Sequence, residues 1–229
     1  MSVDPRLEQI AAAYEATRQR TLAVWEKSPD AGAEAPPPYH PTQRAYAIGS
    51  LFTPPAALEP VISRVLDAEG VTAVPREALH YTFLALTPHQ WDDFDAMPDP
   101  NFLAAGTRLR LHDLRFEISN LKLLPLPNTL LLAGFPSIEM LDARERLLGD
   151  LMKNGITAAW LHERYGAAFP PLFWHTTLAR STTTLLPPAL QFLYHELAAV
   201  NFGRLSMAAP RLHAVNFDWT LRRDVAEML

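Results

Sequence analysis

Two short segments of the 229-residue chain carry the same pattern, a histidine and a threonine two positions apart followed by an apolar residue. The first segment is His80-Tyr-Thr82-Phe, and the second is His175-Thr-Thr177-Leu. Alternate side chains of an extended strand point to the same face, so each histidine shares a face with its threonine. A polar pair on one face of an apolar strand indicates that this face lines a cleft. If the two strands oppose each other, two imidazoles and two hydroxyls surround one small site.

Paired imidazoles suit a reaction that both takes up and releases a proton. An imidazole has an ordinary pKa near 6.5, so at neutral pH one copy can accept a proton while a second, differently placed copy donates one. In an in-line attack on phosphorus, one histidine would deprotonate the nucleophile and the other would protonate the departing oxygen. Threonine hydroxyls can donate hydrogen bonds to the non-bridging phosphate oxygens. The sequence contains no HExxH segment and no acidic cluster at metal-ligand spacing, so we expect no metal ion and no cofactor.

The sequence around these pairs resembles a known family, the two-histidine (2H) phosphoesterase superfamily, and within it the bacterial RNA 2′,5′-ligase and 2′,3′-cyclic phosphodiesterase branch. The string His175-Thr-Thr-Leu-Ala-Arg180 resembles the second motif of the family, and His80-Tyr-Thr-Phe-Leu-Ala85 resembles the first. The segment Arg44-Ala-Tyr-Ala-Ile48 is similar to the opening strand, and the resemblance extends from there to the C-terminus. It implies an α+β fold that is bilobal and pseudo-symmetric, each lobe an antiparallel-rich sheet with helices outside and a cleft at the centre.

The resemblance also implies roles for single residues. His80 and His175 would be the catalytic acid and base, in an order that the pseudo-symmetry leaves open, and Thr82 and Thr177 would hold the phosphate. Arg180 would contact the substrate. Strict alternation along the strand places Arg180 on the face away from His175, so this role requires a β-bulge or the end of the strand.

Two aromatic residues are further candidates for substrate binding. Phe173 is in phase with His175 and could stack on a nucleotide base, although an aromatic of the core or the rim is the ordinary interpretation of such a residue. Tyr46, in the segment that resembles the opening strand, is the other candidate. For any one His-x-Thr pair the ordinary interpretation is also structural, with the histidine bonded to a carbonyl and the threonine favoured in a strand. The two matching contexts favour catalysis.

The order strand, helix, His-x-Thr strand occurs twice along the chain. In the first half a strand over 44–52 is followed by a helix that starts after Thr53-Pro54 and ends at Gly70. In the second half a strand over 129–135 precedes a helix capped by Ser137 and ended by Asn154-Gly155. An inserted stretch, residues 156–171, then separates this helix from the His175 strand, and it could narrow or cover the cleft.

The N-terminal residues are predicted to be an addition to this repeated order. Apolar residues at helical spacing predict a helix from Asp4 to about Lys27. The proline-rich residues 28–41 that follow cannot form a helix or a central strand and are interpreted as a linker or a strap. We therefore divide the chain into residues 1–43, helix and strap, and residues 44–229, one bilobal domain. At the other end, Pro187-Pro188 opens a helix to about Val200, and further strands lie between 202 and 221.

Composition limits the choice of partners. The net charge of −5 argues against binding of long duplex nucleic acid, which depends on phosphate neutralisation, and leaves a small nucleotide or an RNA end as substrate. The chain has no cysteine, no apolar stretch of membrane-spanning length and no secretion signal at its start. We expect a cytoplasmic protein, monomeric and without a membrane partner.

Three functions follow as hypotheses. The first is a metal-independent phosphodiesterase that opens 2′,3′-cyclic phosphates or cleaves 2′,5′-linkages in nucleotides or RNA ends, with RNA 2′,5′-ligation as the same chemistry when a hydroxyl replaces water. The second is a non-catalytic protein that binds a nucleotide or an RNA end. The third is an inactive scaffold that docks a partner through its N-terminal helix and strap.

Overall fold

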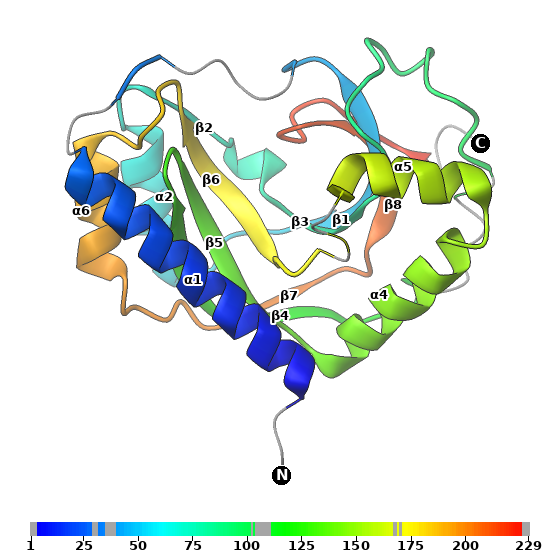
Figure 1. Cartoon of the computed structure of the whole chain (residues 1–229), viewed down its shortest axis with the longest axis horizontal. Helices are drawn as coiled ribbons and strands as arrows, with labels where there is room; N and C mark the ends of the chain where they lie inside the picture. The colour runs from blue at the N-terminus through cyan, green and yellow to red at the C-terminus, as the bar shows by residue number, and fades with distance from the viewer. Residues whose placement is uncertain are drawn as a thin grey trace.

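Two antiparallel sheets form the body of the protein (Figure 1). The computed structural model describes residues 4–28, 32–34, 40–101, 103, 111–166, 169 and 171–225. The first sheet has the strand order β3-β1-β8-β9, with bounds β3 His80–Ala85, β1 Arg44–Leu51, β8 Arg211–Asn216 and β9 Arg222–Asp224. The second sheet has the order β2-β6-β5-β4-β7, with bounds β2 Val71–Ala73, β6 His175–Ser181, β5 Thr129–Pro136, β4 Phe116–Leu126 and β7 Leu205–Met207.

The helices begin at residues that favour a helix start. The described α-helices are α1 Pro5–Lys27, α2 Glu59–Leu66, α4 Ile138–Leu151, α5 Gly155–Tyr165 and α6 Pro188–Leu197, and short 3₁₀ turns lie at Ala56–Leu58 and Arg76–Ala78. The carboxylate of Asp4, the hydroxyl of Ser137 and the amide oxygen of Asn154 accept backbone N–H groups at the starts of α1, α4 and α5. Among these helices none is long and apolar enough to cross a membrane.

The predicted two-lobed α+β fold is confirmed, and its two halves are built alike. In the first half β1 pairs antiparallel with β3, and in the second half β5 pairs antiparallel with β6. Each half also lends strands to the other, since β8 and β9 from the end of the chain complete the first sheet and β2 from the first half pairs with β6. The two His-x-Thr strands therefore belong to different sheets, and the exchanged strands tie these sheets together.

The core lies on the faces of β3 and β6 that point away from the histidines. Tyr81 and Phe83 alternate with His80 and Thr82, and both aromatic side chains are fully buried. The Tyr81 hydroxyl donates to the Leu132 carbonyl at 2.9 Å, and the Phe83 ring meets the edge of Trp174 with 5.7 Å between ring centroids. Apolar contact between the two sheets thus fixes β3 relative to β6.

Helix α1 is an exception to the expectation that helices lie outside. It packs against Leu131 and Ala133 of β5, which are paired in register with Thr177 and His175 and therefore lie on the same face as these residues. Figure 1 shows α1 crossing in front of β4 and β5. The added N-terminal helix thus covers the part of the second sheet beside the His-x-Thr strand.

Polar contacts from α1 to the main chain of the second sheet fix its position. The Tyr14 hydroxyl accepts the Trp174 N–H at 2.9 Å and lies 2.9 Å from the Gly134 carbonyl, to which it can donate. Further along α1, the Thr21 hydroxyl donates to the Pro125 carbonyl and the Trp25 indole N–H to the Pro127 carbonyl. Trp174 directly precedes His175, so Tyr14 anchors the start of the second His-x-Thr strand.

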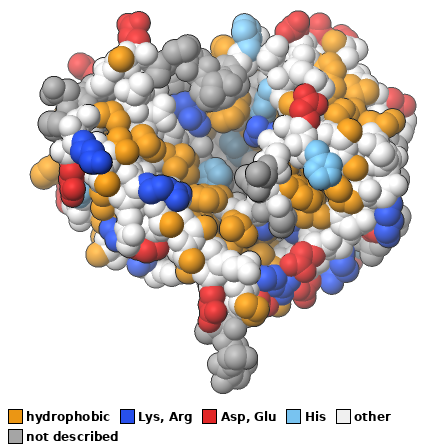
Figure 2. Space-filling model, viewed as in Figure 1, with side chains coloured by type: hydrophobic (Ala, Val, Ile, Leu, Met, Phe, Trp, Pro, Cys, Tyr) orange, Lys and Arg blue, Asp and Glu red, His pale blue; other side chains and the backbone are white. Residues whose placement is uncertain are grey.

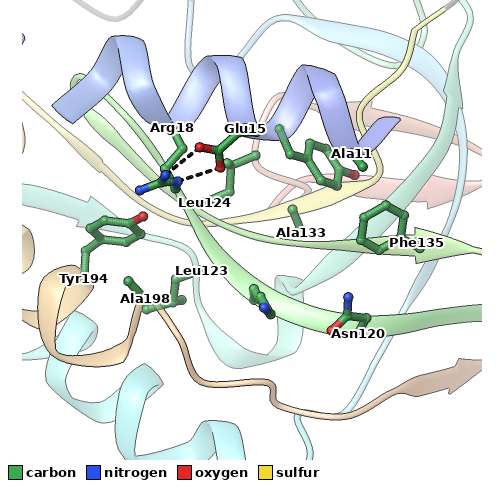
Figure 3. A pocket seen from close by; sticks show the side chains of 12 residues that line it. Ala11, Glu15, Arg18, Asn120, Leu123, Leu124, Ala133, Phe135, Tyr194 and Ala198 are labelled. Atoms are coloured by element: carbon green, nitrogen blue, oxygen red, sulfur yellow. Dashed lines mark hydrogen bonds and ion pairs between the residues drawn. The ribbon is translucent and has the colours of Figure 1, made fainter. Parts of the chain in front are cut away.

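A groove runs between α1, β4 and α6, away from the His-x-Thr strands (Figure 3). Arg18 lies in this groove, where Glu15 binds its guanidinium with Nε to carboxylate oxygen at 2.8 Å. Tyr194 of α6 lies on the opposite side of the groove. The charge of the arginine is therefore already balanced within α1.

Two further predicted segments are the proline-rich strap and the inserted stretch at 156–171. Most of the proline-rich strap, residues 29–31 and 35–39, lies outside the described residues. The inserted stretch at 156–171 was given no secondary structure by the sequence, but the structure shows helix α5 over most of it.

We expect Tyr14→Phe to lower the free energy of unfolding by about 1–3 kcal/mol, because the buried Trp174 N–H loses its acceptor. Urea denaturation would measure the loss. Tyr194→Phe is a matched control, since it removes the same atom beside the already paired Arg18 and should cost less. Equal losses in the two variants would show that Tyr14 does not anchor β6.

Candidate active site

The two His-x-Thr pairs line one cleft between the sheets. His80 and Thr82 of β3 and His175 and Thr177 of β6 all contribute to its wall, and the cavity has a volume of about 170 Å³. Figure 2 shows the molecule hollowed at the centre of this face, with histidine side chains inside the hollow and Lys or Arg side chains at its edge. Both threonine side chains are half-buried, and neither hydroxyl has a hydrogen-bond partner among the described residues.

His80 is held by a carbonyl on one side and an indole on the other. Its Nδ1 lies 2.8 Å from the Ala78 carbonyl oxygen, which can only accept, so Nδ1 carries the proton of the neutral ring. The Trp219 ring stacks on the imidazole, with 4.4 Å between centroids and 10° between planes. The second nitrogen, Nε2, is thereby left as an acceptor for a group in the cleft.

Trp219 is placed by a tight turn after β8. It has a positive φ of 61°, a conformation that L-residues rarely adopt. The Asn216 side chain holds this turn by accepting the Leu221 N–H and donating to Thr220 Oγ1. Gly49 of β1 provides the space for the ring, because a Cβ there would lie 2.8 Å from Trp219 and 2.5 Å from a backbone oxygen.

His175 has a different environment. It is half-buried, and the Phe173 ring meets it edge-on with 6.1 Å between centroids. Its Nδ1 is buried without a hydrogen-bond partner in the described part of the chain. No carbonyl therefore fixes its tautomer, in contrast to His80.

Burial makes both imidazoles weak bases. Removal from water lowers the pKa of His80 to about 4, the Ala78 carbonyl opposes this shift, and the positive charge of a protonated His175 adds to it. Burial, with a smaller effect of the Arg180 charge, lowers the pKa of His175 to about 4 as well. Both rings are consequently neutral at pH 7 in the unliganded protein.

A β-bulge decides the position of Arg180. The register of β6 against β5 runs from Thr177 opposite Leu131 to Ala179 opposite Leu130, so Leu178 is an extra residue. Burial follows the same break, because Leu178 and Ala179 are both buried and Arg180 is half-buried like Thr177. Arg180 therefore returns to the face of His175, as the sequence analysis required for a substrate role. Its guanidinium lies over Phe217, which lines the cleft, at 5.1 Å from the ring centroid.

The first motif contains the equivalent bulge. Against β1, Thr82 is opposite Gly49 and Leu84 is opposite Ile48, so Phe83 is the extra residue. The position that corresponds to Arg180 is therefore Ala85, which lines the cleft without a charge. Its N–H donates to the Tyr165 hydroxyl of α5 at 2.9 Å. Helix α5 of the inserted stretch therefore lies beside Ala85, at the end of the first motif.

The two aromatic candidates lie in different places. Phe173 lines the cleft beside His175, and it also packs edge-on against Tyr14 of α1. Tyr46 does not reach the cleft, which corrects its assignment as a substrate-binding residue. Its side chain is fully buried, and its hydroxyl donates to the Pro98 carbonyl at 2.6 Å. Ala45 and Ala47 line the cleft instead, so Tyr46 points to the opposite face of β1.

The cleft also contains several residues from outside the two motifs. The cleft wall also contains residues from the ends of β3 and β8, from α4 and from the inserted segment, namely His89, Arg144, Arg164, Tyr165, Phe217 and Trp219. The placement of Arg164 and Tyr165 agrees with the expectation that the insertion narrows the cleft. No sequence pattern marks Arg144 or Trp219, because only the tertiary structure brings α4 and the turn after β8 to the histidines. Among the described residues, no three His, Cys, Asp or Glu side chains group as a metal ion would require.

Comparison with known proteins gives structural neighbours only. No protein-family model and no curated protein matches the sequence. The protein TT0787 of Thermus thermophilus superposes with a TM-score of 0.51 at 19% identity, over 80% of this chain and 94% of that chain. Escherichia coli LigT complexed with NADP⁺ gives 0.43 at 18% identity, over 81% and 94%. A protein described as a phosphoesterase gives 0.45 at 16% identity, over the same shares of the two chains.

The match to TT0787 shows that this chain shares its fold with a solved protein. A match at this identity establishes the fold alone.

We expect Trp219→Leu to raise the pKa of His80 from about 4 toward 6.5, because the imidazole would lose its stacked cover and gain contact with water. NMR titration of the histidine ring signals would measure the change, with His80→Ala used to assign the signal. The signal of His175, whose ring packs against Phe173 and not against Trp219, serves as the internal control. An unchanged pKa of His80 would show that Trp219 does not control its hydration.

Proposed function

We propose that this protein is a two-histidine phosphoesterase that cleaves a phosphodiester, a 2′,3′-cyclic phosphate or a 2′,5′-linkage, in a nucleotide or at an RNA end. The observation that carries the proposal is the joint presence of His80, Thr82, His175 and Thr177 in the wall of one cleft. The electrostatic influence of His175 on His80 supports their proximity. Thr82 and Thr177 offer hydroxyls that have no hydrogen-bond partner in the described part of the chain to the non-bridging oxygens of the phosphate.

The reaction requires one base and one acid. One imidazole takes a proton from water as the water oxygen bonds to phosphorus, and the other gives a proton to the ribose oxygen as its bond to phosphorus breaks. The scheme uses these side chains alone, so it needs no metal ion. With a ribose hydroxyl in place of water, the same two proton transfers would join RNA ends.

We assign the base to His80 and the acid to His175. The Ala78 carbonyl fixes the neutral tautomer of His80 with Nε2 as acceptor, which is the form that can take a proton. His175 has no such partner at Nδ1, and the Arg180 charge nearby disfavours its protonation in the empty cleft. A phosphodiester anion would offset that charge and favour the protonated ring, which is the form that an acid needs.

Replacing either histidine should abolish most of the activity. We expect His80→Ala and His175→Ala each to lower kcat/KM at least ~10²-fold, and the double variant to be little worse, because the two groups act in one step. Phosphorus NMR of adenosine 2′,3′-cyclic phosphate and of 2′,5′-linked dinucleotides, in excess chelator, would follow turnover. His112→Ala changes an exposed histidine outside the cleft and should leave the rate unaltered.

The results would separate the competing hypotheses. Near-normal activity in either single variant would contradict the acid–base pair, and binding without turnover would favour the non-catalytic protein. An aryl diester such as bis(p-nitrophenyl) phosphate tests the assignment of the roles, because its leaving group departs without a proton. On this substrate His175→Ala should retain a larger share of the wild-type rate than His80→Ala.

The pH dependence should differ between kcat/KM and kcat. With both pKa values near 4 in the free protein, the form with a single proton on the pair becomes scarcer as the pH rises above 4, so kcat/KM should fall between pH 6 and 8. The bound diester raises the pKa of the acid, so the bell-shaped profile of kcat should have its maximum at a higher pH. Steady-state kinetics across this range would show it. A kcat/KM that rises from pH 5 to 7 would contradict the lowered pKa values.

A further inference from the structure

Arg144 of α4 is a buried cation that forms no ion pair with any of the residues that the structure describes. Its side chain lines the cleft, yet the residue is only 6% exposed. The guanidinium lies over the Trp174 ring at 4.0 Å from its centroid, and it has no hydrogen bond or ion pair within the described residues. The neighbouring Glu145 binds Arg6 of α1 at 3.0 Å. Burial lowers the pKa of Arg144 to about 10, and the smaller opposing effects, which include the charge of Glu145, do not offset it.

Arg164 of α5 is a second cation in the same wall. It is half-buried, its Nε is buried without a hydrogen-bond partner among the described residues, and it forms no ion pair there. Its charge helps to lower the pKa of His89, another residue of the cleft. Surface arginines behave differently, since Arg64 and Arg76 bind Glu196 and Glu59 at 2.9 and 2.8 Å.

The described wall of the cleft offers these two cations no acidic partner. The described residues that line the cleft include Arg144, Arg164 and three histidines but no Asp or Glu, although the chain has a net charge of −5. Guanidinium groups that lack partners and face a partly desolvated cavity are suited to phosphate, which accepts paired N–H donors. The cleft therefore has more capacity for anions than one phosphodiester requires.

These two arginines lie beside other parts of the His-x-Thr strands than Arg180 does. Arg180 lies beyond Thr177 toward the end of β6, whereas Arg144 packs on Trp174, which precedes His175 at the start of β6. Arg164 lies next to Tyr165, whose hydroxyl holds the Ala85 N–H at the uncharged counterpart of Arg180. The inserted helix thus supplies positive charge on the side where the first motif has none.

We propose that Arg144 and Arg164 form a second phosphate site, so that the substrate is a nucleotide or an RNA end with a phosphate at its 5′ oxygen in addition to the 2′ or 3′ phosphate that reacts. This inference rests on the proposed function for the identity of the reacting group. It adds that a nucleoside 2′,3′-cyclic phosphate without a 5′-phosphate is an incomplete substrate.

Binding of unreactive nucleotides tests the site without any need for turnover. Calorimetry would compare adenosine 2′,5′-bisphosphate with adenosine 2′-monophosphate on the full chain. We expect the second phosphate to tighten binding about tenfold or more, and Arg144→Gln or Arg164→Gln to remove most of this gain while affinity for the monophosphate changes little. Arg146→Gln is the matched control, because Arg146 is an exposed residue of the same helix outside the cleft.

Two outcomes would overturn the proposal. One is equal affinity of the wild type for the two nucleotides, and the other is a gain that persists in Arg164→Gln, the half-buried position at which folding is least at risk. Folding of each variant would be checked by circular dichroism. A dinucleotide ending in a 2′-phosphate distinguishes the source of the second phosphate, since tight binding that depends on Arg164 would indicate an RNA end, and its absence a free nucleotide.

Kinetics then connect the site to the reaction. Turnover of adenosine 2′,3′-cyclic phosphate with and without a 5′-phosphate should show a higher kcat/KM for the former, through KM, and this advantage should disappear in Arg164→Gln. Absence of turnover for both, together with the expected binding difference, would contradict the proposed function but support the second site. Turnover of both at one rate, with equal binding, would support the proposed function and contradict the second site.

Discussion

The β-bulges at Phe83 and Leu178 govern which side chains reach the cleft, because one extra residue moves everything after it to the other face of the strand. Before each bulge, histidine and threonine share the cleft face by simple alternation. After each bulge the face changes, so two successive apolar residues are buried and the next position returns to the cleft. In β6 this position is Arg180. In β3 it is Ala85, and the two halves of the site differ in charge for this reason.

Desolvation sets the chemistry within this frame. The sheets meet through aromatic contacts such as Phe83 with Trp174, which hold the histidine faces at a partly dry cavity. His80 is further covered by Trp219, whose turn depends on Asn216 and whose ring requires Gly49. A buried imidazole stays neutral until an anion arrives. The protonation of the two imidazoles is therefore coupled to the binding of an anion in the cleft.

The segments outside the repeated order take part in the site. Helix α1 holds the backbone at Trp174 through Tyr14, directly before His175. The inserted helix α5 carries Arg164 and Tyr165 to the side of the cleft beside Ala85. These additions leave the two His-x-Thr strands unchanged and alter what surrounds them. Such an arrangement allows the same proton transfers to be combined with a different choice of substrate.

The sequence determined the elements whose signals are local. Alternation paired His80 with Thr82 and His175 with Thr177, capping residues such as Ser137 marked helix starts, and the repeated order of strand, helix and His-x-Thr strand indicated two similar halves. The tertiary structure alone decided the rest. A bulge depends on the register between two strands, so the sequence could assign Arg180 to the substrate only if β6 contained a bulge. Tyr46 was wrongly assigned to the cleft. Arg144 and Trp219 are distant from the motifs in sequence, and no local pattern records that packing of α4 and of the turn after β8 brings them to the histidines.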